Sequence, residues 1–130
     1  MAKRTLATCQ FHIDKCVEPN RRAVIRQMKR AKAVGAHLAH FSETCLNGCL
    51  CSELKAAREV DWQATRDAMY EIRATAAALR LWVVVGCNHP LTGKHKPHNS
   101  LYVIDDRGQI VNRYDKMFCC GDHERMEGQP

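Results

Sequence analysis

Residues 81–87, Leu-Trp-Val-Val-Val-Gly-Cys, form a continuous apolar run of residues that favour β-strands. A strand with one face in water alternates apolar and polar side chains, whereas an unbroken apolar run is typical of a strand buried on both faces. The run therefore predicts a strand inside a sheet that is covered from both sides.

Strand and helix patterns alternate before this run. Residues 5–11 and 36–41 carry apolar, β-branched and aromatic side chains and predict two short strands. Between them, residues 21–34 predict a helix, with Asn20 as its N-cap and Gly35 ending it. The apolar face of this helix is made by Val24, Met28 and Ala31.

A second helix is predicted over residues 59–79, and two further strands follow the apolar run. These strands cover residues 100–105 and 109–114, and the tight turn Asp106-Arg107-Gly108 between them predicts a hairpin. The inward face of the second helix comprises Trp62, Thr65, Met69, Ile72, Ala76 and Leu79.

The predicted order is β-α-β-α-β-β-β, which is typical of a layered α/β domain. The length of 130 residues holds one domain at most. After Tyr114 the pattern stops, and residues 115–130 end without a closing helix or strand. We therefore expect residues 1–130 to be a domain that is cut rather than completed.

The composition is that of an ordinary globular protein. Apolar residues make up 45% and charged residues 26%, with a formal net charge of +6. These values exclude a collagen-like or highly charged disordered chain, and the absence of an apolar run of about 18 residues excludes a transmembrane helix. Residues 1–12 lack the pattern of a secretory signal, so we expect a cytoplasmic protein without a membrane partner.

Six basic residues gather in the first predicted helix. A nucleic-acid-binding face is one interpretation, and the solvated side of an amphipathic helix is the other. No aromatic residues interleave with the charges, as a single-strand binder would need. We therefore favour the solvated helix face and expect no nucleic-acid partner. The six residues are Arg21, Arg22, Arg26, Lys29, Arg30 and Lys32.

Eight cysteines are many for this length, but without an export signal they favour reduced thiols that pack as small hydrophobes. A zinc module is the alternative, because Cys45, Cys49 and Cys51 could bind a metal together with His40 or with the pair at 119–120. Their spacing is not that of a usual zinc knuckle. Three further histidines, at 89, 95 and 98, flank two prolines and favour a solvated loop over a metal site.

Two charged residues lie where open α/β sheets carry their reactive groups, just beyond the ends of strands. Glu43 comes two residues after the strand at 36–41, and Lys116 two residues after the strand at 109–114. A carboxylate and an ammonium at one sheet edge can activate a nucleophile and stabilise an oxyanion. By spacing alone, both could equally be solvated loop residues.

Six segments in a fixed order add a resemblance to a known family. They are residues 6–11 (Leu-Ala-Thr-Cys-Gln-Phe), 33–43 (Ala-Val-Gly-Ala-His-Leu-Ala-His-Phe-Ser-Glu), 81–86, 98–104 (His-Asn-Ser-Leu-Tyr-Val-Ile), 108–110 (Gly-Gln-Ile) and 113–116 (Arg-Tyr-Asp-Lys). Together they resemble the N-terminal half of the nitrilase superfamily, the carbon–nitrogen hydrolases.

This resemblance implies half of an α-β-β-α sandwich and a Glu–Lys–Cys catalytic triad, without a metal or an organic cofactor. Glu43 would be the general base and Lys116 the cation, and the substrate a small amide, carbamoyl compound or nitrile. The family's nucleophilic Cys precedes an aromatic residue on a later strand, whereas Cys119 and Cys120 precede Gly121, so neither is assigned that role.

The expected chain is thus a partial domain with two of three triad members, inactive alone. Its sheet would expose an apolar face, so we expect a homo-oligomer or docking onto a complementary half. A non-catalytic assembly role is the remaining alternative. The residues Ser42, Gly48-Cys49 and Met117-Phe118-Cys119 depart from common family patterns and leave the subfamily open.

Overall fold

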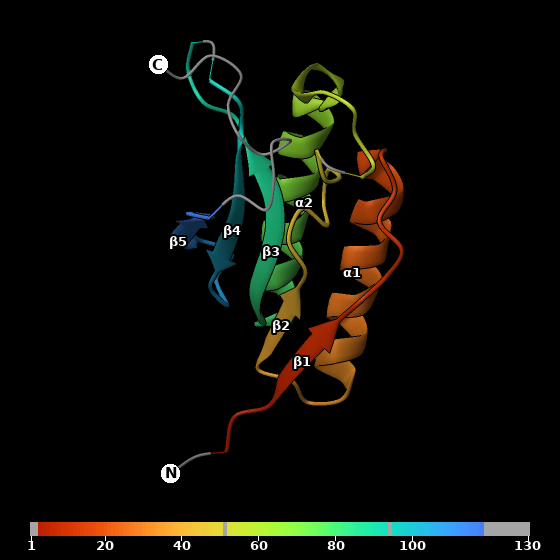
Figure 1. Ribbon diagram of the computed structural model, residues 1–130. Coiled ribbons are helices and arrows are strands. Elements are labelled where there is room, and N and C mark those ends of the chain that lie inside the picture. Colours follow the sequence, from red (N-terminus) through yellow and green to blue (C-terminus); the bar gives the residue numbers. More distant parts are fainter. Residues whose placement is uncertain (1–2, 51, 94, 119–130) are drawn as a thin grey trace.

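The protein is a mixed five-stranded sheet with two long helices on one face (Figure 1). We describe it from a computed structural model, which covers residues 3–50, 52–93 and 95–118. In chain order the elements are β1 (Leu6–Cys9), α1 (Val17–Ala33), β2 (Leu38–Phe41), the short 3-10 helix η1 (Ala57–Glu59), α2 (Trp62–Leu79), β3 (Trp82–His89), β4 (His98–Ile104) and β5 (Ile110–Asp115).

The strands lie in the order β1-β2-β3-β4-β5, so each strand neighbours the next one in the chain. The first three are parallel, and β4 and β5 are antiparallel to their neighbours. Crossovers between parallel strands are right-handed, and two that advance in the same direction place both helices on one face. The predicted α/β class, element order and hairpin are confirmed.

The helices cover the inner face of the sheet and form the core with it. Val83 and Val85 of β3 are fully buried there, together with Ile104 of β4. The predicted apolar face of α1 is confirmed. The helices contribute Val24, Met28, Ala31, Ala68, Ile72 and Ala76 to this core.

The outer face of the sheet differs from the prediction that residues 81–87 are buried on both sides. Trp82 keeps 39% of its surface exposed and Leu6 keeps 59%, while Val84 is half-buried. Leu6, Leu38 and Trp82 stand side by side in register across β1, β2 and β3. Among the described residues, no helix or strand packs over this side (Figure 1).

The prediction that Asn20 caps the first helix is wrong. The helix α1 begins one turn earlier, at Val17 with Cys16 as N-cap, because Pro19 is tolerated in a first helical turn. Asn20 is fully buried and bonds elsewhere: its side chain accepts from the backbone N–H of Asp14 and donates to the carbonyl of Leu46. Gly35 follows the helix with φ +78°, as predicted for a helix stop.

The second helix and the strands β3 and β4 also have bounds that differ from the predicted ones. The helix α2 begins at Trp62 rather than at residue 59, because the carboxylate of Asp61 caps it by accepting from the N–H of Ala64. The ladder between β3 and β4 extends to the pair His89 and His98, which lengthens both strands into the predicted loop.

No helix among the described residues combines the length and the apolarity that crossing a membrane requires.

Candidate active site

Glu43 lies in a sharp turn that follows β2 and rests against the middle of β3. The contact point is Gly86, where an added Cβ would come within 2.2 Å of the Ser42 carbonyl oxygen and 2.6 Å of the Glu43 Cα. Only glycine allows this approach. The carbonyl of Gly86 in turn accepts from the N–H of Leu46 at 3.1 Å, so β3 holds the turn on both sides of Glu43.

Buried amides fix the loop that continues from this turn. The side-chain oxygen of Asn47 accepts from the backbone and the side chain of Asn88, at 2.9 and 3.0 Å. Asn88 also donates to the carbonyl of Gly48 at 2.7 Å. Since buried amides that satisfy each other hold a unique geometry, the loop is anchored to the end of β3.

Lys116 follows β5 and reaches the same place. Its backbone N–H donates to the carbonyl of Asn99 at 2.9 Å, and its ammonium lies 3.2 Å from Oε2 of Glu43. Asn99 Nδ2 donates to the same oxygen at 2.9 Å. The structure thus brings together the two residues that sequence reasoning selected, 73 positions apart in the chain.

The surroundings suit acid–base chemistry at a surface that a partner or substrate can reach. The Glu43 side chain is 58% exposed, whereas that of Lys116 is 22% exposed. A carboxylate can accept a proton here, and the adjacent ammonium can stabilise a negative charge that develops beside it. The contribution of Asn99 was missed by sequence reasoning, although Asn99 lies in one of the six segments that carry the resemblance.

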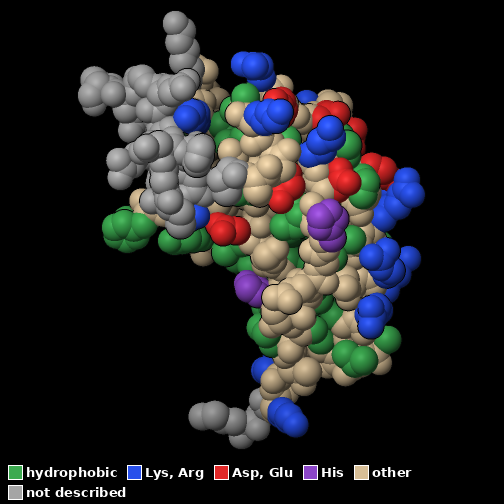
Figure 2. Space-filling view, turned by 45° about the vertical axis from the view of Figure 1, so that its right-hand side comes forward, with side chains coloured by type: hydrophobic (Ala, Val, Ile, Leu, Met, Phe, Trp, Pro, Cys, Tyr) green, Lys and Arg blue, Asp and Glu red, His purple; other side chains and the backbone are tan. Residues whose placement is uncertain are grey.

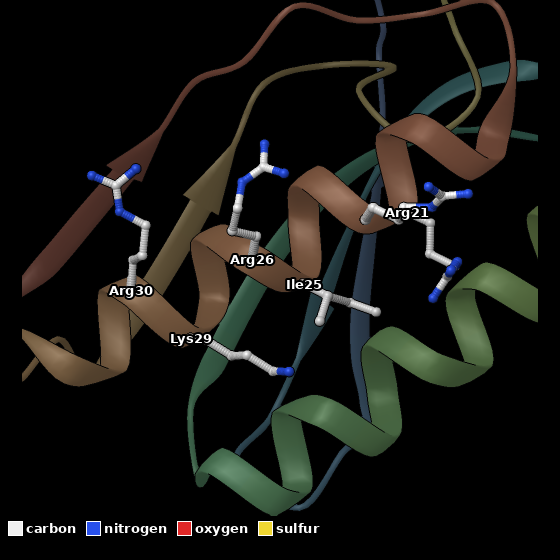
Figure 3. A pocket seen from close by; sticks show the side chains of 6 residues that line it. Arg21, Ile25, Arg26, Lys29 and Arg30 are labelled. Atoms are coloured by element: carbon white, nitrogen blue, oxygen red, sulfur yellow. The ribbon is translucent and has the colours of Figure 1, made fainter.

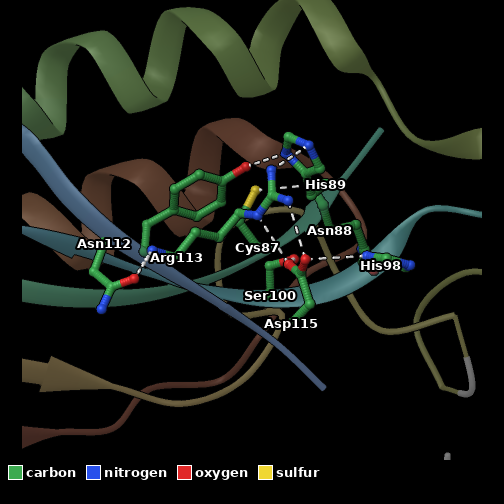
Figure 4. A network of polar contacts seen from close by, with 9 residues as sticks. Cys87, Asn88, His89, His98, Ser100, Asn112, Arg113 and Asp115 are labelled. Carbon is green, nitrogen blue, oxygen red and sulfur yellow. Dashed lines mark hydrogen bonds and ion pairs between the residues drawn. The ribbon is translucent and has the colours of Figure 1, made fainter. Parts of the chain in front are cut away.

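A polar network on the inner face fixes the residue before Lys116 (Figure 4). Burial acts to raise the pKa of Asp115, but hydrogen bonds from Ser100, Arg113 and His98 outweigh it and lower that pKa to about 2. Ser100 Oγ donates to Asp115 at 2.6 Å, and the His98 ring lies 3.2 Å from it. This carboxylate therefore anchors the end of β5.

The network continues to β3 through a second histidine. Arg113 donates to Nε2 of His89, so Nδ1 carries the proton and donates to the Tyr102 hydroxyl. Burial and the nearby Arg113 lower the pKa of His89, while burial raises the pKa of Tyr102 to about 12. The expectation that residues 89 and 98 belong to a solvated loop is wrong, because both lie in strands and bind these partners (Figure 4).

The described thiols do not supply a nucleophile at this site. Burial raises the pKa of Cys9, Cys45 and Cys87. For Cys45 the pKa rises to about 12. Such thiols are protonated at neutral pH and pack as small hydrophobes, as predicted. Cys16 is exposed at the start of α1, in a pocket with Leu54 and Asp61 whose lining includes neither Glu43 nor Lys116.

The prediction that the cysteines are reduced thiols is wrong for Cys49, which is disulfide-bonded. This also bears on the zinc hypothesis, since a disulfide sulfur and the neutral, buried thiol of Cys45 are poor zinc ligands. Within the described residues, no group of three or more histidine, cysteine, aspartate or glutamate side chains could hold a metal ion. Cys51, Cys119 and Cys120 lie outside those residues.

The basic residues of α1 lie along one side of the molecule (Figure 2). Arg21 bridges to Glu18 within the helix and to Glu71 of α2, so part of this charge ties the helices together. Figure 3 shows Arg21, Ile25 and Lys29 on the side of α1 toward α2. Arg22 pairs with Glu18, while Arg26, Lys29 and Arg30 line a shallow surface hollow together with Ile25. This arrangement fits the predicted solvated helix face.

Comparisons with known proteins show the family and the fold. Residues 5–128 match the sequence profile of the family described as carbon-nitrogen hydrolase. The chain therefore belongs to the carbon–nitrogen hydrolase family. Among curated protein sequences, none matches significantly.

Solved structures of an amidase from Nesterenkonia sp. share the fold. One superposes with a TM-score of 0.75 at 20% identity, covering 98% of this chain and 49% of the amidase. A variant of that amidase in complex with butyramide gives a TM-score of 0.82 with the same identity and coverage. The third, a variant with acrylamide added to the active-site cysteine, gives 0.80 at 18% identity, with coverage of 98% and 51%. The chain thus spans about half the length of these structures.

Proposed function

We propose that this chain contributes the general base and the cationic group of a carbon–nitrogen hydrolase that acts on a small amide, carbamoyl compound or nitrile. The observation that supports this most strongly is the 3.2 Å contact between the Lys116 ammonium and the Glu43 carboxylate, on two different strand ends. The family membership and the amidase fold of the structural neighbours agree with it.

The chemistry follows from the charges. Glu43 takes the proton of a cysteine thiol, and the resulting thiolate attacks the substrate carbon. As the carbonyl oxygen or nitrile nitrogen becomes negative, Lys116 stabilises it. The protonated Glu43 gives its proton to the departing nitrogen, so an amide loses ammonia or an amine and leaves a thioester, which water hydrolyses with the regenerated Glu43 carboxylate as the base. No organic cofactor takes part in these steps.

We further propose that the nucleophilic thiol comes from polypeptide beyond this partial domain, so the chain holds two of the three groups. The structural neighbours are about twice as long as this chain. One of them carries acrylamide on its active-site cysteine. The described thiols are buried, disulfide-bonded or away from Glu43, as argued above. The 130-residue chain alone should therefore bind small amides without hydrolysing them.

The test combines an ammonia-release assay with NMR titration of the purified chain by butyramide. We expect no ammonia, and chemical-shift changes concentrated at Glu43, Asn99 and Lys116 that disappear in Lys116→Ala. Absence of shifts at these residues overturns the proposed amide site. Ammonia release that is lost in Glu43→Gln supports the hydrolase but overturns the claim that the thiol lies elsewhere.

The outer sheet face also enters the proposal. Leu6, Leu38 and Trp82 form an apolar row, with Tyr114 54% exposed further along the same face. We propose that a complementary half of the domain packs there, because this chain spans about half of its structural neighbours. A second copy of the chain is the alternative occupant. The cytoplasm remains the proposed location, supported by the free thiols of Cys9, Cys16, Cys45 and Cys87 and opposed by the disulfide of Cys49.

A further inference from the structure

We infer that Asn99 is the positioning residue for the Glu43 carboxylate: its amide holds Oε2 against Lys116, so that Oε1 is the oxygen that accepts the proton. This inference rests on the proposed function for the meaning of Oε1. The positioning itself rests on contacts within this chain.

The two oxygens of Glu43 have different surroundings. Oε2 accepts from Asn99 Nδ2 at 2.9 Å and lies 3.2 Å from the Lys116 ammonium. No hydrogen bond to Oε1 comes from any described residue. The terminal torsion of a glutamate rotates over a broad range, so an exposed carboxylate is poorly oriented by itself. Two donors on one oxygen fix that torsion and leave the other oxygen with its lone pairs available.

Asn99 is suited to this task because it contacts both members of the pair. Its backbone carbonyl accepts the N–H of Lys116 at 2.9 Å while its side chain donates to Glu43. It also lies within β4, between β3 and β5, in register with Asn88. The strand therefore sets the distance between the two charged groups through one residue.

The neutral amide also has a chemical advantage over a second cation. An amide N–H donates a hydrogen bond without placing a second positive charge beside the carboxylate. A general base needs both orientation and the ability to take a proton. Asn99 supplies the first and leaves the second to Glu43.

The experiment measures the Glu43–Lys116 contact directly in the full 130-residue chain. A water-soluble carbodiimide joins a carboxylate to an amine as an amide only when the two are in contact, and mass spectrometry of the digested protein quantifies the Glu43–Lys116 product. Asn99→Ala removes the amide, while Asn99→Asp keeps the size but removes the donor. Asn112→Ala is the matched control, because Asn112 is an exposed asparagine of β5 whose side chain bonds, among the described residues, only to the N–H of Arg113.

We expect the cross-link yield to fall roughly fivefold or more in both Asn99 variants and to stay unchanged in Asn112→Ala, since a hydrogen bond to a charged group is lost in each Asn99 variant. Circular dichroism checks that each variant is folded. An unchanged yield in folded Asn99→Asp overturns the inference, because a space-filling role alone would survive that substitution.

A second measurement needs no Asn99 variant. In the wild-type chain the side-chain amide protons of Asn99 should exchange slowly with water, and Glu43→Ala should speed this exchange roughly tenfold. Equal rates in both proteins overturn the inference. Neither readout depends on substrate, so failure of butyramide to bind would remove the proposed function without affecting this result.

Discussion

The two faces of the sheet obey different rules. On the inner face, Val83, Val85 and Ile104 are fully buried under α1 and α2. On the outer face, Trp82 and Leu6 remain exposed although their side chains are also apolar. The burial of the inner face follows from the periodicity of the helices and strands of this chain. The burial of the outer face depends on what packs against it.

The candidate site belongs to the outer side. Val85 and Cys87 point inward, so the intervening Gly86 points outward, toward the turn that carries Glu43. Site and apolar row therefore share one face, with the site at the carboxyl end of the parallel strands. The apolar row lies at the start of β1, β2 and β3, on the same face as the site at their carboxyl ends.

The largest expected effect distinguishes the two faces at adjacent positions. Val85→Asp places a charge in the inner core, where Val85 is fully buried, and should cost about 4 kcal/mol or more of the free energy of unfolding. That loss approaches the whole stability of a small domain, so we expect an unfolded chain. Val84→Asp, on the outer face, should cost about 1 kcal/mol. Urea denaturation followed by circular dichroism measures both, and equal losses would contradict the distinction.

A smaller effect is expected where the outer face meets the site. Gly86→Ala forces its Cβ against the Ser42 carbonyl and should lower the free energy of unfolding by about 2 kcal/mol. Gly108→Ala is the matched control, because its Cβ would lie 2.4 Å from the Arg73 carbonyl oxygen.

The stability losses of the two glycine variants should be similar, but only Gly86→Ala should lower the Glu43–Lys116 cross-link yield. Denaturation curves and the carbodiimide assay on the same samples check this. A preserved cross-link in a folded Gly86→Ala chain would show that the turn does not need this close approach.

The inner face is not uniformly apolar, and its polar end predicts a pH dependence. Asp115→Asn removes a charge held by Ser100, Arg113 and His98 and should cost about 2 kcal/mol at pH 7. The pKa of Asp115 is about 2 in the folded protein, below its value of about 3.9 in an unfolded chain. The stability that it contributes is therefore complete above about pH 4 and is lost as the pH falls through about 2.

Denaturation at several pH values should thus show a gap between wild type and Asp115→Asn that is widest near pH 7 and closes toward pH 2. Asp106→Asn is the control, because its carboxylate makes no hydrogen bond or ion pair among the described residues. A gap that is constant between pH 7 and pH 2 would mean that the ionised form of Asp115 is not what stabilises β5.

The sequence predicted what periodicity controls, which includes the order of elements, the hairpin and the apolar face of α1. It also predicted the placement of Glu43 and Lys116, because strand ends meet at one edge of a sheet. The role of Asn20 was wrong, since a buried side chain found tertiary partners in Asp14 and Leu46 instead of capping a helix. The close approach of Gly86 to Ser42 and Glu43 and the hydrogen bond from Asn99 to Glu43 join residues more than 40 positions apart, which no local pattern encodes.

The smallest expected effect on stability concerns the apolar row itself. Trp82→Ser should change the free energy of unfolding of the single chain by about 1 kcal/mol or less, because the indole is already 39% exposed. The same substitution should weaken association strongly, since exposed aromatic side chains dominate interfaces once they are buried. Sedimentation velocity at increasing protein concentration should show the wild type associating and Trp82→Ser remaining monomeric.

If the wild type associates only when second-half polypeptide is added, a complementary half covers the outer face rather than a second copy of the chain. A wild type that stays monomeric in both experiments would mean that the outer face is solvated, and the difference between the two faces would then be one of composition without consequence for assembly.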